Sequence, residues 1–137
     1  MSKIFVLDAC ALVAVLKDEN GADVVAAAYN KAKTGEARII MNRVNLLEVY
    51  YGYYRDKGKK YAEKIMDGVA QSVISISEFD KTLFTEAGRL KASYKISLAD
   101  AIALAQTSIS DGELLTSDHH EFDSVEKHEG IRFHWIR

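Results

Sequence analysis

The 137-residue sequence predicts a single-domain α/β protein in which helices flank a mainly parallel, twisted β-sheet. Short apolar runs typical of buried strands alternate along the chain with longer segments of helical character. This alternation is typical of parallel sheets covered by helices. The length suits one domain with a sizeable core. No linker, repeat or low-complexity tract divides the chain, so the predicted domain spans residues 1–137.

The elements are expected in a regular order. Strands are predicted at residues 3–7, 38–41, 72–76, 112–117 and 131–136, and helices at residues 9–17, 22–33, 43–55, 59–71, 81–95 and 98–107. Because the chain has no proline, other residues must mark the ends of these elements. Gly35 ends one helix, and Gly58 separates two others. Asn42, Asp80 and Ser97 have side chains that can cap the helices they precede.

Composition and charge leave several function classes open. The net charge of −2 is not that of a typical nucleic-acid binder, although a local basic patch or a bound metal can outweigh it. Cys10 is the only cysteine, which rules out an intrachain disulfide and suits a reducing compartment. The N-terminal segment does not have the pattern of a signal peptide, and no apolar stretch approaches the ~20 residues of a membrane span. We therefore expect a cytoplasmic protein with no membrane partner.

Four carboxylates occupy unusual positions. Asp8 and Asp118 directly follow predicted strands, at the sheet edge where α/β proteins place their ligands. Glu48 lies in the helical segment "VNLLEVYYGYY" and has no basic residue one turn away. Asp100 interrupts "SLADAIALA", whose apolar residues on every side predict a buried helix. An isolated charge in such a helix is costly, so Asp100 needs a compensating partner.

A purely structural role is open for three of these acids. Ser97 and Asp100 fit the capping-box pattern, and Asp8 and Asp118 can cap the segments that follow them. Four carboxylates about 5 Å apart in one crevice would nevertheless repel one another by ~3 kcal/mol per pair, more than caps worth ~1 kcal/mol can offset. Divalent cations can offset this repulsion, and an all-oxygen site favours Mg²⁺ or Mn²⁺. Such a metal, with a positioned water and a phosphate, is suited to phosphodiester hydrolysis.

The chain resembles the PIN domain, the metal-dependent ribonuclease fold found in toxins of the VapC type. The resemblance spans nearly all of the sequence and rests on "IFVLDACAL", "NLLEVYYGY", "SLADAIALA" and "LLTSDHHEF", in that order. It implies a PIN-like α/β/α sandwich whose catalytic metal site is built from Asp8, Glu48, Asp100 and Asp118. The sequence departs from the family in one respect. The family often has a serine or threonine just after the first aspartate, where Ala9 and Cys10 stand here.

The resemblance also implies an activity and partners. The protein is expected to be an endoribonuclease that uses Mg²⁺ or Mn²⁺ to hydrolyse RNA phosphodiester bonds. It would be the toxin of a type II toxin–antitoxin pair, held inactive by a cognate antitoxin, and small nucleases of this type tend to form homodimers. Near the fourth acid, Thr116 and Ser117 keep hydroxyl groups, and Glu121 and Asp123 lie close enough in sequence to serve as auxiliary acids.

An aromatic and basic segment, "YYGYYRDKGKKY", spans residues 50–61. Tyrosines can stack on bases and cations can contact phosphates, so this segment is suited to RNA. Tyrosines at helical spacing are, however, more often core or interface residues. We favour a core or dimer-interface role for the tyrosines. Phosphate contacts are assigned to the four cations of this segment, namely Arg55, Lys57, Lys59 and Lys60.

Two alternative functions depend on the same residues. Cys10 with His119 or His120 could form a thiol hydrolase, but a lone cysteine in an apolar stretch is more often a core residue. The two adjacent histidines cannot easily share one metal from an extended segment, because strand side chains alternate in direction. A receiver-like, phosphate-accepting module could also bind Mg²⁺ in an acidic pocket. Such a module would need paired acids after the first strand, and Cys10 stands where the second would be.

Overall fold

The computed structural model describes residues 3–137. These residues form five strands and seven helices, in the order β1 (Lys3–Leu7), α1 (Ala9–Leu16), α2 (Ala22–Lys33), β2 (Ala37–Asn42), α3 (Arg43–Lys57), α4 (Lys59–Ala70), β3 (Ile74–Ser77), α5 (Lys81–Ser93), α6 (Leu98–Ser110), β4 (Glu113–Thr116), α7 (His119–His128) and β5 (Arg132–Trp135). Every predicted strand and helix is present, with ends within three residues of the expected ones.

The five strands form one sheet in the order β3-β2-β1-β4-β5, and all neighbouring strands are parallel. From β1 the chain winds to one side through β2 to β3, and it then returns to the other side of β1 to add β4 and β5. The winding direction therefore switches between β1 and β4. Leu7 pairs with Leu115 in these two strands, so the next residues lie side by side: Asp8 directly follows β1, and Thr116 is the last residue of β4. Ligands of open α/β sheets bind at such switch points.

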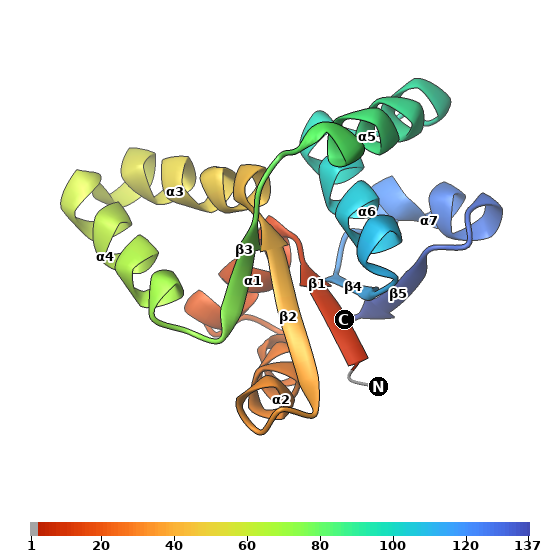
Figure 1. Ribbon diagram of the computed structural model, residues 1–137. Helices are drawn as coiled ribbons and strands as arrows, with labels where there is room; N and C mark the ends of the chain where they lie inside the picture. The colour runs from red at the N-terminus through yellow and green to blue at the C-terminus, as the bar shows by residue number, and fades with distance from the viewer. Residues whose placement is uncertain (1–2) are drawn as a thin grey trace.

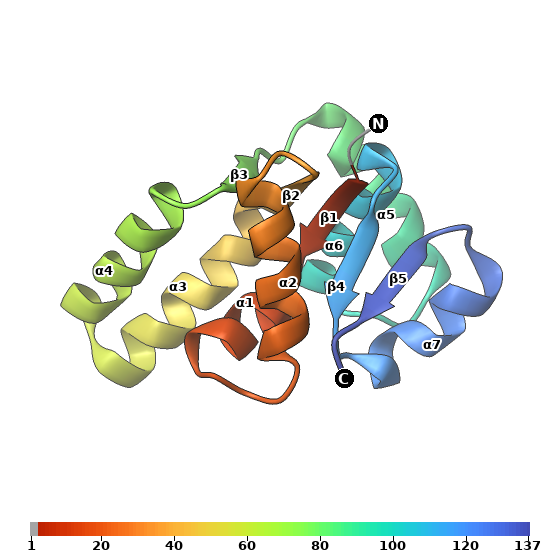
Figure 2. The ribbon, with the colours of Figure 1, turned by 90° about the horizontal axis from the view of Figure 1, so that it is seen from below.

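Helices cover both faces of the sheet, as Figures 1 and 2 show, and each layer has its own core. Because strand side chains alternate in direction, β1 contributes to both cores. Phe5 and Leu7 pack with residues of α1 to α4, whereas Val6 packs with residues of α5, α6 and α7. The predicted α/β/α sandwich is confirmed. No helix within residues 3–137 combines the length and apolar character needed to cross a membrane.

Helix α6 is the central helix of the second layer. All seven residues from Ala101 to Thr107 are buried, which confirms the prediction of a buried helix around Asp100. Helix α6 packs on α5 and also contacts β1, β2, β4 and α3. Because α6 leads directly into β4, it ends at the amino edge of the parallel sheet and its first turn lies toward the carboxyl edge. Asp100 is therefore placed near the switch point by the fold itself.

Helix α7 was not predicted, and residues 118–123 were expected to be extended. In the structure Asp118 caps this helix, since its Oδ1 accepts a hydrogen bond from the Glu121 N–H at 3.3 Å. Phe122 and Val125, one turn apart, are fully buried against the second core. The capping acid and this short apolar stripe explain why the segment is helical.

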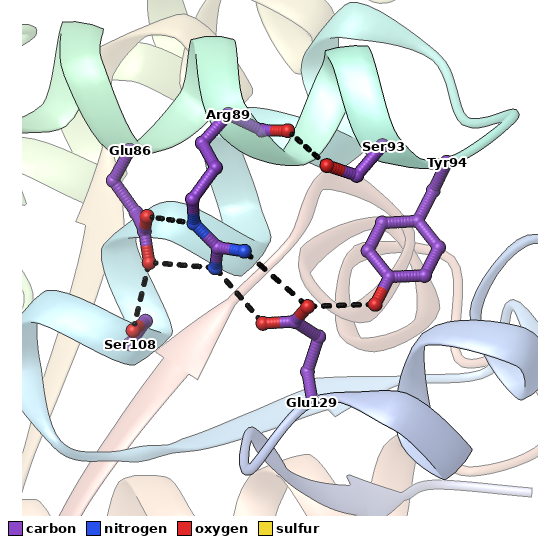
Figure 3. A network of polar contacts seen from close by, with 6 residues as sticks. All are labelled: Glu86, Arg89, Ser93, Tyr94, Ser108 and Glu129. Carbon is purple, nitrogen blue, oxygen red and sulfur yellow. Dashed lines mark hydrogen bonds and ion pairs between the residues drawn. The ribbon is translucent and has the colours of Figure 1, made fainter.

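A polar network fastens the end of α7 to the α5–α6 layer (Figure 3). The Arg89 guanidinium on α5 lies between two carboxylates, 2.7 Å from Glu86 and 2.8 Å from Glu129. The Tyr94 hydroxyl donates to Glu129 at 2.6 Å, and the Ser108 hydroxyl of α6 is 3.2 Å from Glu86. Hydrogen bonds from Arg89 hold the pKa of both Glu86 and Glu129 below the usual range. This network lies at the far end of α7 from Asp118.

Candidate metal centre

Asp8 is the most buried acid of the candidate site, with 4% of its surface exposed. It ends β1 and caps α1, where its Oδ1 accepts a hydrogen bond from the Ala11 N–H at 2.8 Å. Burial raises its pKa to about 6, and the nearby charge of Asp118 adds to this effect. Hydrogen bonds from Thr116, Ala11 and Cys10 act in the opposite direction, because they stabilise the charged carboxylate.

Asp118 approaches Asp8 from the neighbouring strand. It follows β4 as the cap of α7, and its backbone N–H donates to the Thr116 hydroxyl at 3.1 Å. The same hydroxyl interacts with Asp8, so Thr116 connects the ends of β1 and β4 at the switch point. Thr116 is fully buried, which fixes this arrangement.

Asp100 lies in the first turn of α6. The predicted capping box is present, because the Asp100 N–H donates to the Ser97 hydroxyl at 3.1 Å. The cap does not offset the cost of burying the Asp100 charge. Burial is the main cause that raises the pKa of Asp100 to about 7. The charges of Asp118, Asp8 and Glu121 act in the same direction, whereas the hydrogen bond to Ser97 lowers the pKa.

Asp8, Asp100 and Asp118 therefore form one acidic cluster, which we call the aspartate cluster. Its members come from the ends of two strands and the start of one helix, and Asp8 is distant in sequence from the other two. Among residues 3–137, the main causes of the Asp8 and Asp100 shifts are burial, neighbouring acids and hydrogen bonds. The acids thus raise one another's pKa, as expected where carboxylates lie close together.

Glu48 stands apart from the aspartate cluster. It is half-buried on α3, where burial raises its pKa and the Asn45 amide lowers it. The side chain lines a cavity of 180 Å³ between α1 and α3, together with Lys17, Gly52 and Arg55. Among the described residues, no group of three acidic, thiol or imidazole side chains is arranged closely enough to enclose a metal ion. Charge interactions thus link three of the four predicted acids, Asp8, Asp100 and Asp118, whereas Glu48 lines a separate cavity.

Cys10 lies at the site rather than in the core interior. Its Sγ is 2.8 Å from the Ser117 hydroxyl, and the residue is half-buried. Burial and the charge of Asp8 raise the pKa of the thiol. A raised pKa keeps the group protonated and disfavours nucleophilic catalysis. Cys10 and Ser117 instead connect the β1–α1 and β4–α7 junctions, next to Asp8 and Asp118.

Of the remaining polar residues of α7, Glu121 interacts with the aspartate cluster, whereas Asp123 and the two histidines are exposed. Glu121 is half-buried and its charge reaches Asp100, as expected of an auxiliary acid. Asp123 is exposed and lies 3.5 Å from the His119 ring. That ring stacks on Trp135 with centroids 3.8 Å apart. His119 and His120 begin a helix, so the expectation of an extended segment was wrong, and both side chains are exposed.

The four predicted phosphate-binding cations lie around the corner between α3 and α4. Figure 1 shows this corner at the outer end of α3, away from α6 and α7. Arg55 shares the cavity of Glu48, although its Nε is also 3.2 Å from Asp56. Lys57, Lys59 and Lys60 are exposed, and the Lys59 ammonium is 3.9 Å from Glu63. Only Arg55 therefore shares a cavity with a predicted site acid.

Sequence reasoning did not identify Asn45. This residue is 1% exposed, and its Nδ2 donates to the Ala99 carbonyl at 3.0 Å, next to Asp100. It also lies one turn before Glu48 on α3. The signal was the spacing of Asn45 and Glu48, three residues apart, which places both side chains on one helix face.

Comparison with known proteins identifies the class that this fold and site define. The model of the PIN domain family matches residues 5–128, so the chain belongs to that family. A comparison with curated proteins found no significant match. The family match favours the nuclease interpretation over the receiver-like module.

Solved structures of toxin–antitoxin systems share the fold. VapBC from Salmonella typhimurium, bound to DNA, matches with a TM-score of 0.77 and 15% identity over 100% of both chains. VapBC2 from Rickettsia felis, bound to a promoter fragment, matches with a TM-score of 0.76 and 17% identity over 96% of this chain and 98% of that one. VapC20 from Mycobacterium tuberculosis, a sarcin-ricin loop cleaving toxin, matches with a TM-score of 0.65 and 16% identity over 96% and 94%. At these identities the likeness shows a common fold.

The aspartate cluster is chemically suited to the divalent metals of PIN nucleases. It offers carboxylate oxygens, which Mg²⁺ and Mn²⁺ prefer, and its mutual repulsion favours a bound cation. The residues present therefore fit the metal in donor type and charge.

Proposed function

We propose that this protein is a Mg²⁺- or Mn²⁺-dependent endoribonuclease that acts as the toxin of a toxin–antitoxin pair. The observation that carries the proposal is the aspartate cluster at the switch point, where Asp8 and Asp100 have pKa values raised to about 6 and about 7. Membership of the PIN domain family supports the nuclease class. The common fold with VapC toxins supports the biological role.

The proposed chemistry assigns different tasks to the side chains. Asp8, Asp100 and Asp118 would hold the metal, with Glu48 completing the site from α3. A bound metal supplies neutralisation of the phosphate charge and activation of a water molecule. Thr116 and Cys10 favour the charged form of Asp8, because their hydrogen bonds lower its pKa. The cap of α7 holds Asp118 in place, and Glu121 adds negative charge beside Asp100.

RNA cleavage by the purified protein tests the proposal. Single-stranded RNA should be cut in the presence of Mg²⁺ or Mn²⁺, and EDTA should stop the reaction. Asp8→Asn should abolish cleavage, whereas Cys10→Ala should retain most of it, because the thiol has no catalytic role in this proposal. Cleavage that survives EDTA, or that is lost in Cys10→Ala and kept in Asp8→Asn, would refute the proposal.

We also propose a groove for the antitoxin. Two adjoining cavities of 160 and 300 Å³ share Leu12, Val15, Tyr29 and Ile74, and their walls come from α1, α2, α4 and β3. The walls are almost entirely apolar, and Val15 is exposed at the surface. Apolar side chains of an amphipathic antitoxin helix would fit this groove.

The groove proposal predicts the effect of one substitution. The product of a gene adjoining this one, co-expressed with it, should co-purify with the wild type and not with Val15→Glu. The exposed Phe84→Glu on α5 serves as a control that should retain the partner. Equal co-purification with both variants would place the antitoxin elsewhere.

A further inference from the structure

We infer that Asn45 is a positioning residue of the proposed metal centre. Its buried amide fixes α3, which carries Glu48, against the first turn of α6, which carries Asp100. Its free oxygen accepts a hydrogen bond from a water molecule held between the two helices. The inference rests on the proposed function, because it assigns Asn45 to the metal site of that proposal.

Asn45 makes a direct contact between α3 and α6. The Asn45 Nδ2 donates to the Ala99 carbonyl at 3.0 Å. Ala99 lies in the first turn of α6 and directly precedes Asp100. Its carbonyl therefore accepts the Asn45 N–H at the start of the helix. A change in this contact would move the start of α6 relative to α3. The bond therefore sets the separation of the helices that present Asp100 and Glu48.

The second step concerns the orientation of Glu48. Asn45 and Glu48 are three residues apart on α3, so their side chains share one face. An amide has two N–H groups, and one of those in Asn45 is used by Ala99. The other N–H lies on the helix face that also carries Glu48, so Asn45 is placed to orient that carboxylate.

The third step is the oxygen of the same amide. The Asn45 Oδ1 is a buried side-chain atom, and it has no hydrogen-bond donor among residues 3–137. An unsatisfied buried acceptor costs about 1–3 kcal/mol, and most such groups in folded proteins bond to protein or ordered water. A water molecule beside the acids is the donor whose chemistry fits this position. The same water would link the protein to a metal held at the aspartate cluster.

A purely structural amide is present nearby for comparison. Gln106 on α6 is 5% exposed, and its Oε1 accepts from the Asn42 Nδ2 at 3.1 Å. Its Nε2 donates to the Ser110 hydroxyl at 3.0 Å, so both ends of the amide are satisfied. Gln106 therefore ties the N-cap of α3 to α6. Asn45 differs from it in the free oxygen and in its position next to Glu48.

The experiment compares Asn45→Leu with Gln106→Leu, by calorimetric titration of Mn²⁺ and thermal unfolding of the metal-free protein. Leucine has a similar volume and no polar atoms, so Asn45→Leu removes both the hydrogen bond to Ala99 and the acceptor of the water, and it should unfold below the wild-type temperature. Its Mn²⁺ dissociation constant should rise about tenfold or more, as for other residues that orient metal ligands. Gln106→Leu should unfold at a lower temperature and bind Mn²⁺ with wild-type affinity.

The outcomes separate the inference from the proposed function. Wild-type Mn²⁺ affinity in Asn45→Leu, with binding intact in the wild type, overturns the inference alone. Absence of Mn²⁺ binding in the wild type overturns both. If Asn45→Leu does not fold, Asn45→Ser, which cannot reach Ala99, should show the same rise in dissociation constant. A crystal structure of the wild type should place an ordered water on the Asn45 Oδ1, and a protein donor there would contradict the inference.

Discussion

At the scale of single residues, the protonation of Asp8 and Asp100 dominates the behaviour of the site. Their pKa values of about 6 and about 7 lie above the ordinary aspartate value of 3.8. In the unfolded chain both groups lose their protons near pH 4. Between about pH 4 and pH 7 the native state therefore binds more protons than the unfolded state. Asp8 and Asp100 therefore make the metal-free protein less stable as pH rises through this range.

Asp100→Asn removes part of this pH dependence. We expect the melting temperature of the wild type in EDTA to be lower at pH 8 than at pH 5. The variant should show a smaller drop and should be more stable than the wild type at pH 8. Thermal unfolding at several pH values measures this directly. Parallel curves for the two proteins would show that Asp100 keeps an ordinary pKa.

The charge of Glu48 can be tested separately from its shape. Glu48→Gln preserves volume, so any loss of RNA cleavage reports the missing charge. We expect cleavage to fall about a hundredfold or more, with an unchanged unfolding midpoint in urea, because small changes in metal geometry cost large factors in rate. The exposed Glu63→Gln on α4 is the matched control. Wild-type cleavage by Glu48→Gln at saturating Mg²⁺ would remove Glu48 from the site.

At the scale of elements, local sequence patterns predicted most of the structure. Asn42, Asp80 and Ser97 cap helices as expected, because each supplies an oxygen to the first turn. Helix α7 was missed because its apolar stripe is only Phe122 and Val125 in an otherwise polar segment. The pattern of Asp118 followed by Glu121 was a capping signal. The segment is helical because the packing of α7 on the second core outweighs its weak local helix pattern.

The part of the candidate site that lies at strand ends was also predictable from local sequence patterns. Asp8 and Asp118 follow parallel strands, so their proximity follows from the sheet once β1 and β4 are neighbours. The position of Glu48 depends on how α3 crosses α6, which is set by packing between distant residues. Asn45 holds that crossing, and a buried amide contact with a backbone carbonyl leaves no pattern in the sequence.

Helix α3 also contains a glycine that the fold does not require. A Cβ at Gly52 would meet no other atom within 4 Å, and the same holds for Gly88 on α5. Alanine at either position should raise the free energy of unfolding by about 0.5–1 kcal/mol. Gly52 lines the cavity that holds Glu48 and Arg55, whereas Gly88 does not.

Gly52→Ala and Gly88→Ala are therefore expected to differ in their effect on RNA binding. If RNA enters the cavity beside Arg55, Gly52→Ala should weaken RNA binding several-fold while gaining stability, and Gly88→Ala should only gain stability. Urea denaturation and RNA binding to the EDTA-treated protein measure the two effects. Equal RNA affinities would place the substrate path outside this cavity.

At the scale of the whole molecule, exposed apolar side chains suggest an interface. Leu47, Tyr51 and Tyr54 lie along α3 with exposed fractions of 52, 51 and 44%. Their spacing of four and three residues places them on one side of the helix. A contiguous apolar stripe of this kind is typical of interaction surfaces. The predicted homodimer would bury it.

We expect the wild type to elute as a dimer in size-exclusion chromatography with light scattering. Tyr51→Lys should shift the protein toward the monomer, because a charge would be buried at the interface. Tyr61→Lys, an exposed change on α4, is the control. A wild-type monomer across the micromolar range would contradict the dimer prediction.

We propose above all that Asp8, Asp100 and Asp118 together bind one divalent metal. Anomalous diffraction from crystals soaked in Mn²⁺ tests this directly. We expect a Mn²⁺ peak at the carboxyl ends of β1 and β4, with oxygens of the three aspartates at about 2 Å. The side chains should move inward from their metal-free positions to reach it. Saturating Mn²⁺ that leaves this position empty, or binds only elsewhere, would contradict the claim.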